Sequence, residues 1–349
     1  MTKAPDRAAL DQTAPDQTAP DQTAPDQTLA DLSEGEVLAR IFPRLPHADT
    51  ELLGPGDDAA VLSVADGRFV VTCDMMIQGP DFRLAWSTPH DLGWKAAATN
   101  LSDVAAMGAR PTALVVAIAA PPSTPISVIL GIADGLRDGC EALAPGCGVV
   151  GGDLSASDAI TLSITAFGDL EGRAPVLRSG ATAGDVVAHA GRLGDAGIGL
   201  GLLFRFGVDA DGMPDRAAAD DLKLREPRFV EAQLAPVPPI GLGPVAAAAG
   251  ASAMLDVSDG LAIDAGRLAR ASGVGVDFDS AALGDQPELA LGGGEDHGLL
   301  ATFPPAATLP AGFRRIGTVT DQPGLVLVDG EPHTQGGWDP YRGWDGATS

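Results

Sequence analysis

Five aspartates lie where short sequence patterns could bring carboxylates together. They are Asp58, Asp74, Asp103, Asp153 and Asp256. Four follow an apolar strand-like run or occupy a tight glycine turn, whereas Asp103 follows Asn100 by three residues, which places both on one face of a predicted helix. Converging carboxylates raise one another's pKa unless cations neutralise them. Oxygen ligands of this kind suit Mg²⁺ or Mn²⁺.

Each of these motifs also has a simpler structural interpretation. The adjacent acids of "GPGDDAAV", residues 54–61, are of a type that usually forms a turn. The sequence Ser258-Asp259-Gly260 is typical of a helix cap, and the Gly-Gly-Asp at 151–153 is typical of a turn. The chain contains no GxxxxGK[ST] phosphate-binding loop. The residues alone therefore indicate an α/β protein with candidate Mg²⁺ ligands.

The elements that would position these acids in the first half of the chain alternate between strands and helices. Thr88, Pro89 and Asp91 predict a helix start, and Gly108 predicts its end after Met107. The elements expected are a helix at 34–42, a strand at 68–77 whose apolar run ends at Asp74, a helix at 88–107, a strand at 112–120, a helix at 125–143, and a strand, Gly-Gly-Asp turn and strand over 148–168.

A second alternating series follows a boundary near residues 169–180. The elements expected are a strand at 185–191, a helix at 195–207, a charged connector through Arg228, a strand that ends at Asp256, and a helix after Ser258 and Asp259 that buries Leu261, Ala265, Leu268 and Ala269. Strands that alternate with helices in both halves predict an α/β fold.

The charge of the chain restricts its partners. Its 22 Lys+Arg against 47 Asp+Glu give a formal charge of −25, which argues against nucleic acid or an anionic membrane. The three cysteines form no CxxC pair and the five histidines are scattered, so neither a disulfide framework nor a zinc site is expected. The apolar runs are too short to span a membrane, and no signal-peptide pattern opens the chain. We therefore expect a soluble, cytoplasmic protein.

The N-terminal segment differs from the rest of the chain. Residues 11–28 repeat the unit DQTAP, which has no large apolar side chain and cannot offset its ordering entropy by burial. We expect a disordered tail over 1–28, an N-terminal domain over 29–170 and a C-terminal domain over 171–349.

Seven motifs then occur in a fixed order between about residues 34 and 341. They are "GPGDDAAV", "TCDMMIQGPDF", "DLGWKAAATNLSDVAAMGARP", "GGDLSASDAITLSITAFG", "MLDVSDGLAIDAGRLARASGVG", "GGGEDHGLL" and "GGWDPY". Together they resemble the thiamine-monophosphate kinases, members of the aminoimidazole-ribonucleotide-synthetase-like superfamily.

The resemblance implies an activity and an assembly. The activity is ATP-dependent phosphorylation of thiamine monophosphate to thiamine diphosphate, by in-line transfer assisted by several Mg²⁺ ions. The implied fold is an N-terminal α/β domain that pairs with its copy into a dimeric β-barrel, with a C-terminal α/β domain packed against it. No general base is expected, because a phosphate monoester with a second pKa of about 6 is largely dianionic near pH 7.

The resemblance also implies roles for individual residues. Mg²⁺ would be held by Asp58, Thr72, Cys73, Asp74, Asp103, Asp153, Asp256 and Asp259. ATP would contact Gly152, Asp153, Arg178 and Ser258. The acceptor would contact Asp81, Glu295 and Trp338, where a carboxylate and an aromatic face suit a thiazolium cation.

Two positions depart from the family pattern. Asp81 stands where the family usually has a histidine, and His297-Gly298 follows "GGED" where Tyr-Glu or Tyr-Gln is usual. Both positions belong to the predicted acceptor pocket, so the alternatives concern the acceptor. One is an enzyme like aminoimidazole ribonucleotide synthetase or the hydrogenase-maturation dehydratase, although the latter needs a C-terminal cysteine and none follows Cys147. Another is a non-catalytic nucleotide-binding paralogue, which the retained aspartates disfavour.

Overall fold

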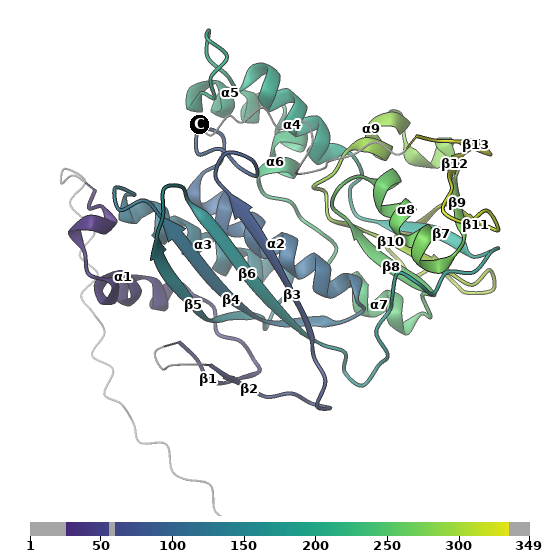
Figure 1. Cartoon of the computed structure of the whole chain (residues 1–349), viewed down its shortest axis with the longest axis horizontal. Helices are drawn as coiled ribbons and strands as arrows, with labels where there is room; N and C mark the ends of the chain where they lie inside the picture. Colours follow the sequence, from purple (N-terminus) through teal and green to yellow (C-terminus); the bar gives the residue numbers. More distant parts are fainter. Residues whose placement is uncertain (1–25, 56–59, 335–349) are drawn as a thin grey trace, which may run out of the picture.

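The structure is a computed structural model that describes residues 26–55 and 60–334. Two mixed β-sheets and the helices packed on them give a mixed α/β fold, as predicted (Figure 1). Asp58, Trp338 and most of the predicted tail lie outside the described residues. Within the part of the tail that is described, the carbonyl of Gln27 accepts a hydrogen bond from Ile126 N at 2.7 Å.

The four-stranded sheet comes from the first half of the chain and has the order β3-β6-β4-β5. Helices α2 and α3 cover one of its faces (Figure 1), and Leu92, Ile129 and Ile164 are fully buried there. β4 and β5 are parallel, and the other neighbours are antiparallel. The elements are β3 (Val70–Ile77), α2 (Pro89–Ala106), β4 (Arg110–Ala120), α3 (Ile126–Leu143), β5 (Gly148–Ala156) and β6 (Thr161–Asp169).

Helix α2 begins and ends as its sequence predicts. Thr88 Oγ1 accepts a hydrogen bond from Asp91 N at 3.0 Å, and Asp91 Oδ2 accepts one from Thr88 N at 3.0 Å. These two bonds satisfy backbone donors that the first turn of a helix leaves free. At the other end Gly108 has φ of 75°, which glycine adopts without strain.

The seven-stranded sheet comes from the second half and has the order β13-β12-β9-β11-β7-β10-β8. β12 and β9 are parallel and the other pairs are antiparallel. Its strands are β7 (Val186–Ala190), β8 (Ala253–Val257), β9 (Gly275–Phe278), β10 (Gly298–Phe303), β11 (Phe313–Thr320), β12 (Val326–Val328) and β13 (Glu331–Pro332). The predicted helix after β8 is α8 (Leu261–Ser272), in which the four predicted apolar positions are buried. β8 forms the edge that faces α2.

The expected charged connector is instead a group of helices. The helix predicted at 195–207 is α4 (Asp195–Phe206), whereas the polar, charge-rich connector predicted after it through Arg228 contains α5 (Arg216–Arg225) and the start of α6 (Pro227–Leu234). The prediction failed because α5 buries little apolar surface, with only Ala219 and Leu222 among its buried residues.

Two aspartates lie elsewhere in their strands than expected. Asp74 lies inside β3 and Asp153 lies inside β5, although each acid was expected at a strand end or in a turn. Glycine at 152 has a packing reason, because a Cβ there would lie 2.0 Å from the carbonyl oxygen of Val116 on β4. The glycine therefore permits close strand pairing and does not form a turn.

The remaining elements are short. They are η1 (Leu29–Asp31), α1 (Glu34–Ile41), η2 (Phe42–Arg44), β1 (Glu51–Leu53), β2 (Val61–Leu62), α7 (Leu242–Ala248), η3 (Ser280–Leu283) and α9 (Pro287–Gly292). Over the described ranges neither sheet closes into a barrel. No helix among the described residues has the length and apolar character needed to cross a membrane.

Candidate functional site

Three carboxylates from both halves of the chain form an acidic cluster: Asp74 on β3, Asp103 on α2 and Asp256 on β8. Asp103 Oδ2 accepts a hydrogen bond from Thr72 Oγ1 at 3.0 Å. Side chains alternate along a strand, so Thr72 and Asp74 share the face of β3 that meets α2. Asn100, one turn before Asp103, accepts from Asp74 N at 3.1 Å. The predicted pairing of Asn100 and Asp103 on one helix face therefore fixes how α2 sits against β3.

Asp256 joins this cluster from the other sheet through a buried hydrogen-bonded group. Its Oδ2 lies 3.2 Å from Ser102 Oγ and 3.2 Å from His297 Nδ1. Ser102 and His297 are both buried. No sequence motif pointed to Ser102, although it directly precedes Asp103. His297 was noted only as a departure from a family pattern.

The cluster is electrostatically unfavourable without a cation. Burial, followed by the Asp256 carboxylate, raises the pKa of Asp103 to about 7 against the opposing hydrogen bond from Thr72. Desolvation also raises the pKa of Asp74, with smaller contributions from Glu295 and Asp256. Burial alone would lower the pKa of His297, but its bond to Asp256 and the nearby negative charges raise it. The surroundings of all three groups disfavour accumulated negative charge.

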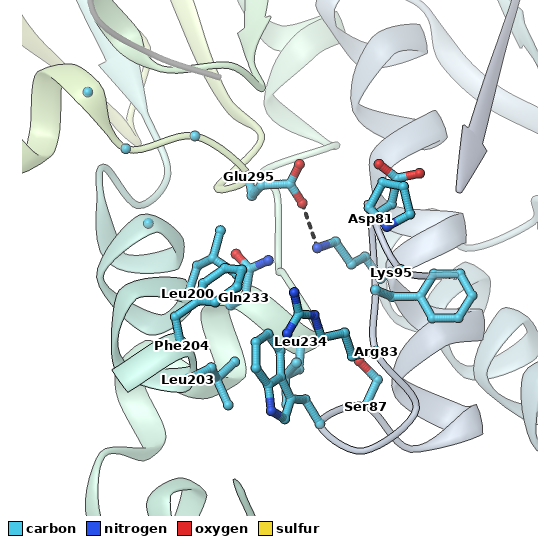
Figure 2. A pocket seen from close by; sticks show the side chains of 18 of the residues that line it. Asp81, Arg83, Ser87, Lys95, Leu200, Leu203, Phe204, Gln233, Leu234 and Glu295 are labelled. Atoms are coloured by element: carbon cyan, nitrogen blue, oxygen red, sulfur yellow. Dashed lines mark ion pairs between the residues drawn. The ribbon is translucent and has the colours of Figure 1, made fainter. Parts of the chain in front are cut away.

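Beside the acidic cluster lies a cavity of about 630 Å³, here called the Lys95 cavity. The segment after β3 and helix α2 line one side, and α4, α6 and the loop after α9 line the other. Lys95, only 5 % exposed, forms an ion pair with Glu295 at 2.5 Å (Figure 2). Gln233, with its amide oriented to satisfy its neighbours, accepts from Lys95 Nζ at 3.1 Å and donates to Ala196 O at 3.1 Å.

The two predicted acceptor contacts that the structure describes both line this cavity. Burial raises the pKa of Glu295, but the Lys95 ammonium and then His297 outweigh it, so the net shift is downward. Burial raises the pKa of Asp81, although Asp81 Oδ2 accepts a hydrogen bond from Ile77 N at 2.7 Å. Glu295 is therefore held as an anion, while Asp81 is more easily protonated than an ordinary aspartate.

The loop that carries Glu295 has a strained backbone. Glu295 and His297 have φ of 70° and 51°, in the region that side-chain-bearing residues rarely adopt. The loop is held by hydrogen bonds from Glu295 N to Ser258 O at 2.7 Å and from His297 N to Val257 O at 3.0 Å. The end of β8 thus orients Glu295 toward the Lys95 cavity and His297 toward the acidic cluster. Backbone strain of this size is most often retained at functional sites.

Ser258 and Asp259 precede α8 but are engaged locally. Asp264 Oδ2 accepts hydrogen bonds from Ser258 N at 3.1 Å and Asp259 N at 3.0 Å. The Asp259 carboxylate is ion-paired with Arg267 at 2.5 Å. Burial raises the pKa of Asp264 to about 6 despite these bonds. The predicted roles of Ser258 and Asp259 stay predictions, and Asp259 would have to release Arg267 to reach a metal ion.

Other predicted site residues lie apart from the acidic cluster. Asp153 on β5 pairs with Ala117 on β4. Ala117 pairs in turn with Ser163 on β6, and Ser163 pairs with Met75 on β3. Cross-strand partners share a face, so Asp153 projects from the sheet face opposite to Asp74. Cys73 lies on that opposite face too, with its Sγ 3.5 Å from Ser163 Oγ.

Gly152 and Asp153 line a second cavity of about 870 Å³ beside α1 and α3. Arg178 is exposed, and only its backbone carbonyl has a described hydrogen bond, from Ser272 Oγ at 2.7 Å. Across the described ranges, no three His, Cys, Asp or Glu side chains form a ready-made metal site. Any metal bound here would need further oxygen ligands from water or substrate.

Comparison with known proteins shows which family the chain belongs to. Residues 56–170 match the model of AIR synthase related protein, N-terminal domain. Thiamine-monophosphate kinase of Mycobacterium tuberculosis is 46% identical over 328 residues, 90% of this chain and 91% of that protein. The chain belongs to the thiamine-monophosphate kinase family.

Other members of the kinase family agree over similar lengths. The thiamine-monophosphate kinase of Corynebacterium glutamicum is 40% identical over 334 residues, 89% of this chain and 94% of that protein. A solved structure of AaThiL complexed with AMPPCP and TMP has a TM-score of 0.67 and 32% identity, and covers 81% of this chain and 90% of that one.

The two departures from the kinase family pattern occupy different environments. Asp81 lines the Lys95 cavity, and its role as an acceptor contact stays a prediction. His297 was expected near the acceptor, but its described side-chain contacts are with Asp256 and Ser102 in the acidic cluster. Sequence reasoning also missed Lys95, whose signal was a lysine within an otherwise small and apolar helix segment.

Proposed function

We propose that this chain transfers the γ-phosphoryl group of ATP to the phosphate of thiamine monophosphate, yielding thiamine diphosphate and ADP. The bond between the γ-phosphorus and the oxygen that bridges the β- and γ-phosphorus atoms breaks, and a bond forms between the γ-phosphorus and an oxygen of the acceptor phosphate. Family membership supports this reaction. The observation that carries it is the meeting of Asp74, Asp103 and Asp256 beside a cavity large enough for an organic acceptor.

The donor set of the acidic cluster fits Mg²⁺. Its carboxylates supply only oxygen ligands. Burial, and after it the Asp256 carboxylate, raise the pKa of Asp103, and a bound divalent cation would offset both effects. Mg²⁺ commonly takes one or two carboxylates and completes its shell with water and substrate phosphates. Asp74, Asp103 and Asp256 would hold the ions, which when bound neutralise the approaching phosphates.

The protein's own groups would then fix the acceptor. Glu295 stays ionised beside Lys95 and suits the thiazolium cation of thiamine. The Lys95 cavity receives the organic part of the acceptor, so that its phosphate points toward the acidic cluster. No side chain has to remove a proton, because the acceptor phosphate is already largely dianionic near pH 7.

We also infer that the chain acts as a homodimer joined through the open face of its four-stranded sheet, with a β-barrel formed between the two copies. This face carries Val71, Met75 and Ile77, which are 54%, 52% and 39% exposed. Exposed apolar side chains on an uncovered sheet face are typical of an interaction site. Light scattering should give twice the chain mass, and Met75→Glu should give the monomer; a monomeric wild type would contradict the inference.

The activity is tested by ³¹P NMR of the protein with ATP, Mg²⁺ and thiamine monophosphate. We expect ADP and thiamine diphosphate to form in equal amounts, and neither to form when Mg²⁺ or the acceptor is omitted. ADP with inorganic phosphate and no thiamine diphosphate, or no reaction, would exclude the proposed function.

A further inference from the structure

Arg83 is a buried cation without a described anionic partner. It is 7% exposed and lines the Lys95 cavity. Within residues 26–55 and 60–334, no carboxylate forms an ion pair with its guanidinium, whereas Lys95 in the same cavity is neutralised by Glu295. A buried charge is costly unless something pairs with it. Other described arginines also lack an ion pair, but among the described arginines Arg83 is the one that is buried, which makes it a candidate for binding a ligand.

Two aromatic rings hold the guanidinium in place. Its central carbon lies 4.7 Å from the centroid of the Trp86 ring and 4.8 Å from that of Phe204. The two rings meet edge to face at 5.1 Å, and Trp86 is fixed by a hydrogen bond from Nε1 to Gly207 O at 2.7 Å. Stacking of this kind stabilises a guanidinium while leaving its N–H groups available. The side chain is therefore oriented before any ligand binds.

The guanidinium points into the cavity. Figure 2 shows Arg83 directed toward the space between Lys95 and Gln233. Arg83 is one of the residues that line the cavity. Around it the wall is mainly apolar, with Leu200, Leu203 and Leu234. This part of the cavity thus combines flat apolar surface with fixed hydrogen-bond donors.

The opposite end of the cavity has the other polarity. Asp81 and Glu295 lie there. Both are close to the acidic cluster, since the Asp74 carboxylate contributes to the raised pKa of Asp81 and the Glu295 carboxylate contributes to the raised pKa of Asp74. If the acceptor is thiamine monophosphate, its phosphate must face the acidic cluster and its thiazolium suits Glu295. The part left for the Arg83 end is the aminopyrimidine, a flat ring with acceptor nitrogens. A guanidinium has donors only, which match those acceptor nitrogens.

We propose that Arg83 determines acceptor specificity by donating a hydrogen bond to a ring nitrogen of the aminopyrimidine. This inference rests on the proposed function for the identity of the acceptor. It assigns the cavity end formed by Arg83, Trp86 and Phe204 to the part of the substrate farthest from the reacting phosphate.

The test measures binding by calorimetry, so it does not depend on turnover. Arg83→Met keeps an unbranched apolar stem but removes the guanidinium and its donors, and Arg83→Lys keeps a cation. Arg205→Gln is the matched control, because Arg205 also lies over a ring, that of Phe206 at 5.0 Å, but is exposed. The ligands are thiamine, thiamine monophosphate, and the phosphate of hydroxyethylthiazole, which lacks the pyrimidine. Circular dichroism and the affinity for ATP with Mg²⁺ check the fold.

We expect Arg83→Met to weaken the binding of thiamine and of thiamine monophosphate by the same factor, at least about tenfold, since a buried hydrogen bond from a charged group is lost. Arg83→Lys should recover part of that loss. The thiazole phosphate and the Arg205→Gln variant should show no change. Unchanged thiamine affinity in folded Arg83→Met, or a loss confined to ligands that carry phosphate, would overturn the proposal. A wild type that binds thiamine but forms no thiamine diphosphate would instead reject the proposed function.

Discussion

The acidic cluster and the Lys95 cavity are neighbours whose charges are balanced differently. In the cluster, Asp74, Asp103 and Asp256 face one another, and the pKa of Asp103 rises to about 7. In the cavity, Glu295 is paired with Lys95 and its pKa falls. The protein therefore compensates the negative charge of the cluster only in part, through His297 beside Asp256, which favours cations, and pairs the charge of Glu295 in the cavity with Lys95, which favours an organic ligand. The predictions below test this division.

The largest effect is expected from Asp103→Asn. Loss of one cluster carboxylate should lower kcat by about a thousandfold, because charge neutralisation is the main contribution that a protein makes to phosphoryl transfer. The fold should survive, since the asparagine can still accept the hydrogen bond from Thr72. Steady-state kinetics and circular dichroism measure both. Asp221→Asn, on the exposed surface of α5, is the control. Wild-type turnover in Asp103→Asn would assign Asp103 a structural role only.

A smaller effect, specific to the acceptor, is expected from Glu295→Gln. The variant loses a carboxylate that suits the thiazolium, so KM for thiamine monophosphate should rise about tenfold while KM for ATP changes little. Initial rates with each substrate varied in turn give the two constants. An equal rise in both would mean that the cavity and the cluster do not act separately.

Stability should depend on pH through Asp103. Its folded pKa of about 7 lies above its ordinary value of 3.8, so the stability that it contributes is present below the ordinary value and is lost as pH rises through 7. Without divalent cations, Tm should fall between about pH 4 and about pH 7 and level off above pH 7, and Mg²⁺ should raise Tm more at pH 7 than at pH 4. Differential scanning fluorimetry follows both. The same curve in Asp103→Asn would assign the effect to other groups.

The smallest effect is expected from Cys73→Ser. The Cys73 side chain lies on the sheet face opposite to Asp103, so activity should stay within about twofold of wild type at saturating Mg²⁺. A loss comparable to that of Asp103→Asn would restore the family-based prediction that the Cys73 side chain acts at the metal site.

Local sequence signals predicted much of the fold. The capping residues Thr88 and Asp91 and the glycine at 108 defined α2, and the spacing of apolar residues defined α8. Local sequence signals failed to predict α5 and the role of Gly152. α5 buries too little apolar surface to show a helical period, and Gly152 serves strand packing, not a turn.

The candidate site was predictable in its carboxylates but not in their partners. Asp74, Asp103 and Asp256 could be selected as acids near strand ends or on a helix face. Ser102 and His297 could not be selected. The contact between Ser102 and Asp256 joins residues more than a hundred positions apart, and the contact between His297 and Asp256 joins residues about forty positions apart. Such contacts depend on how the two sheets pack, which periodicity and spacing within one element do not encode.

The most direct test of the division between cluster and cavity is ligand binding to Asp103→Asn by calorimetry. We predict that thiamine monophosphate binds within about threefold of the wild-type affinity, because the cavity is intact. The Mg²⁺-dependent affinity for ATP should fall at least about tenfold, because the cluster has lost a ligand. Equal loss of both affinities, or loss of neither, would contradict the account.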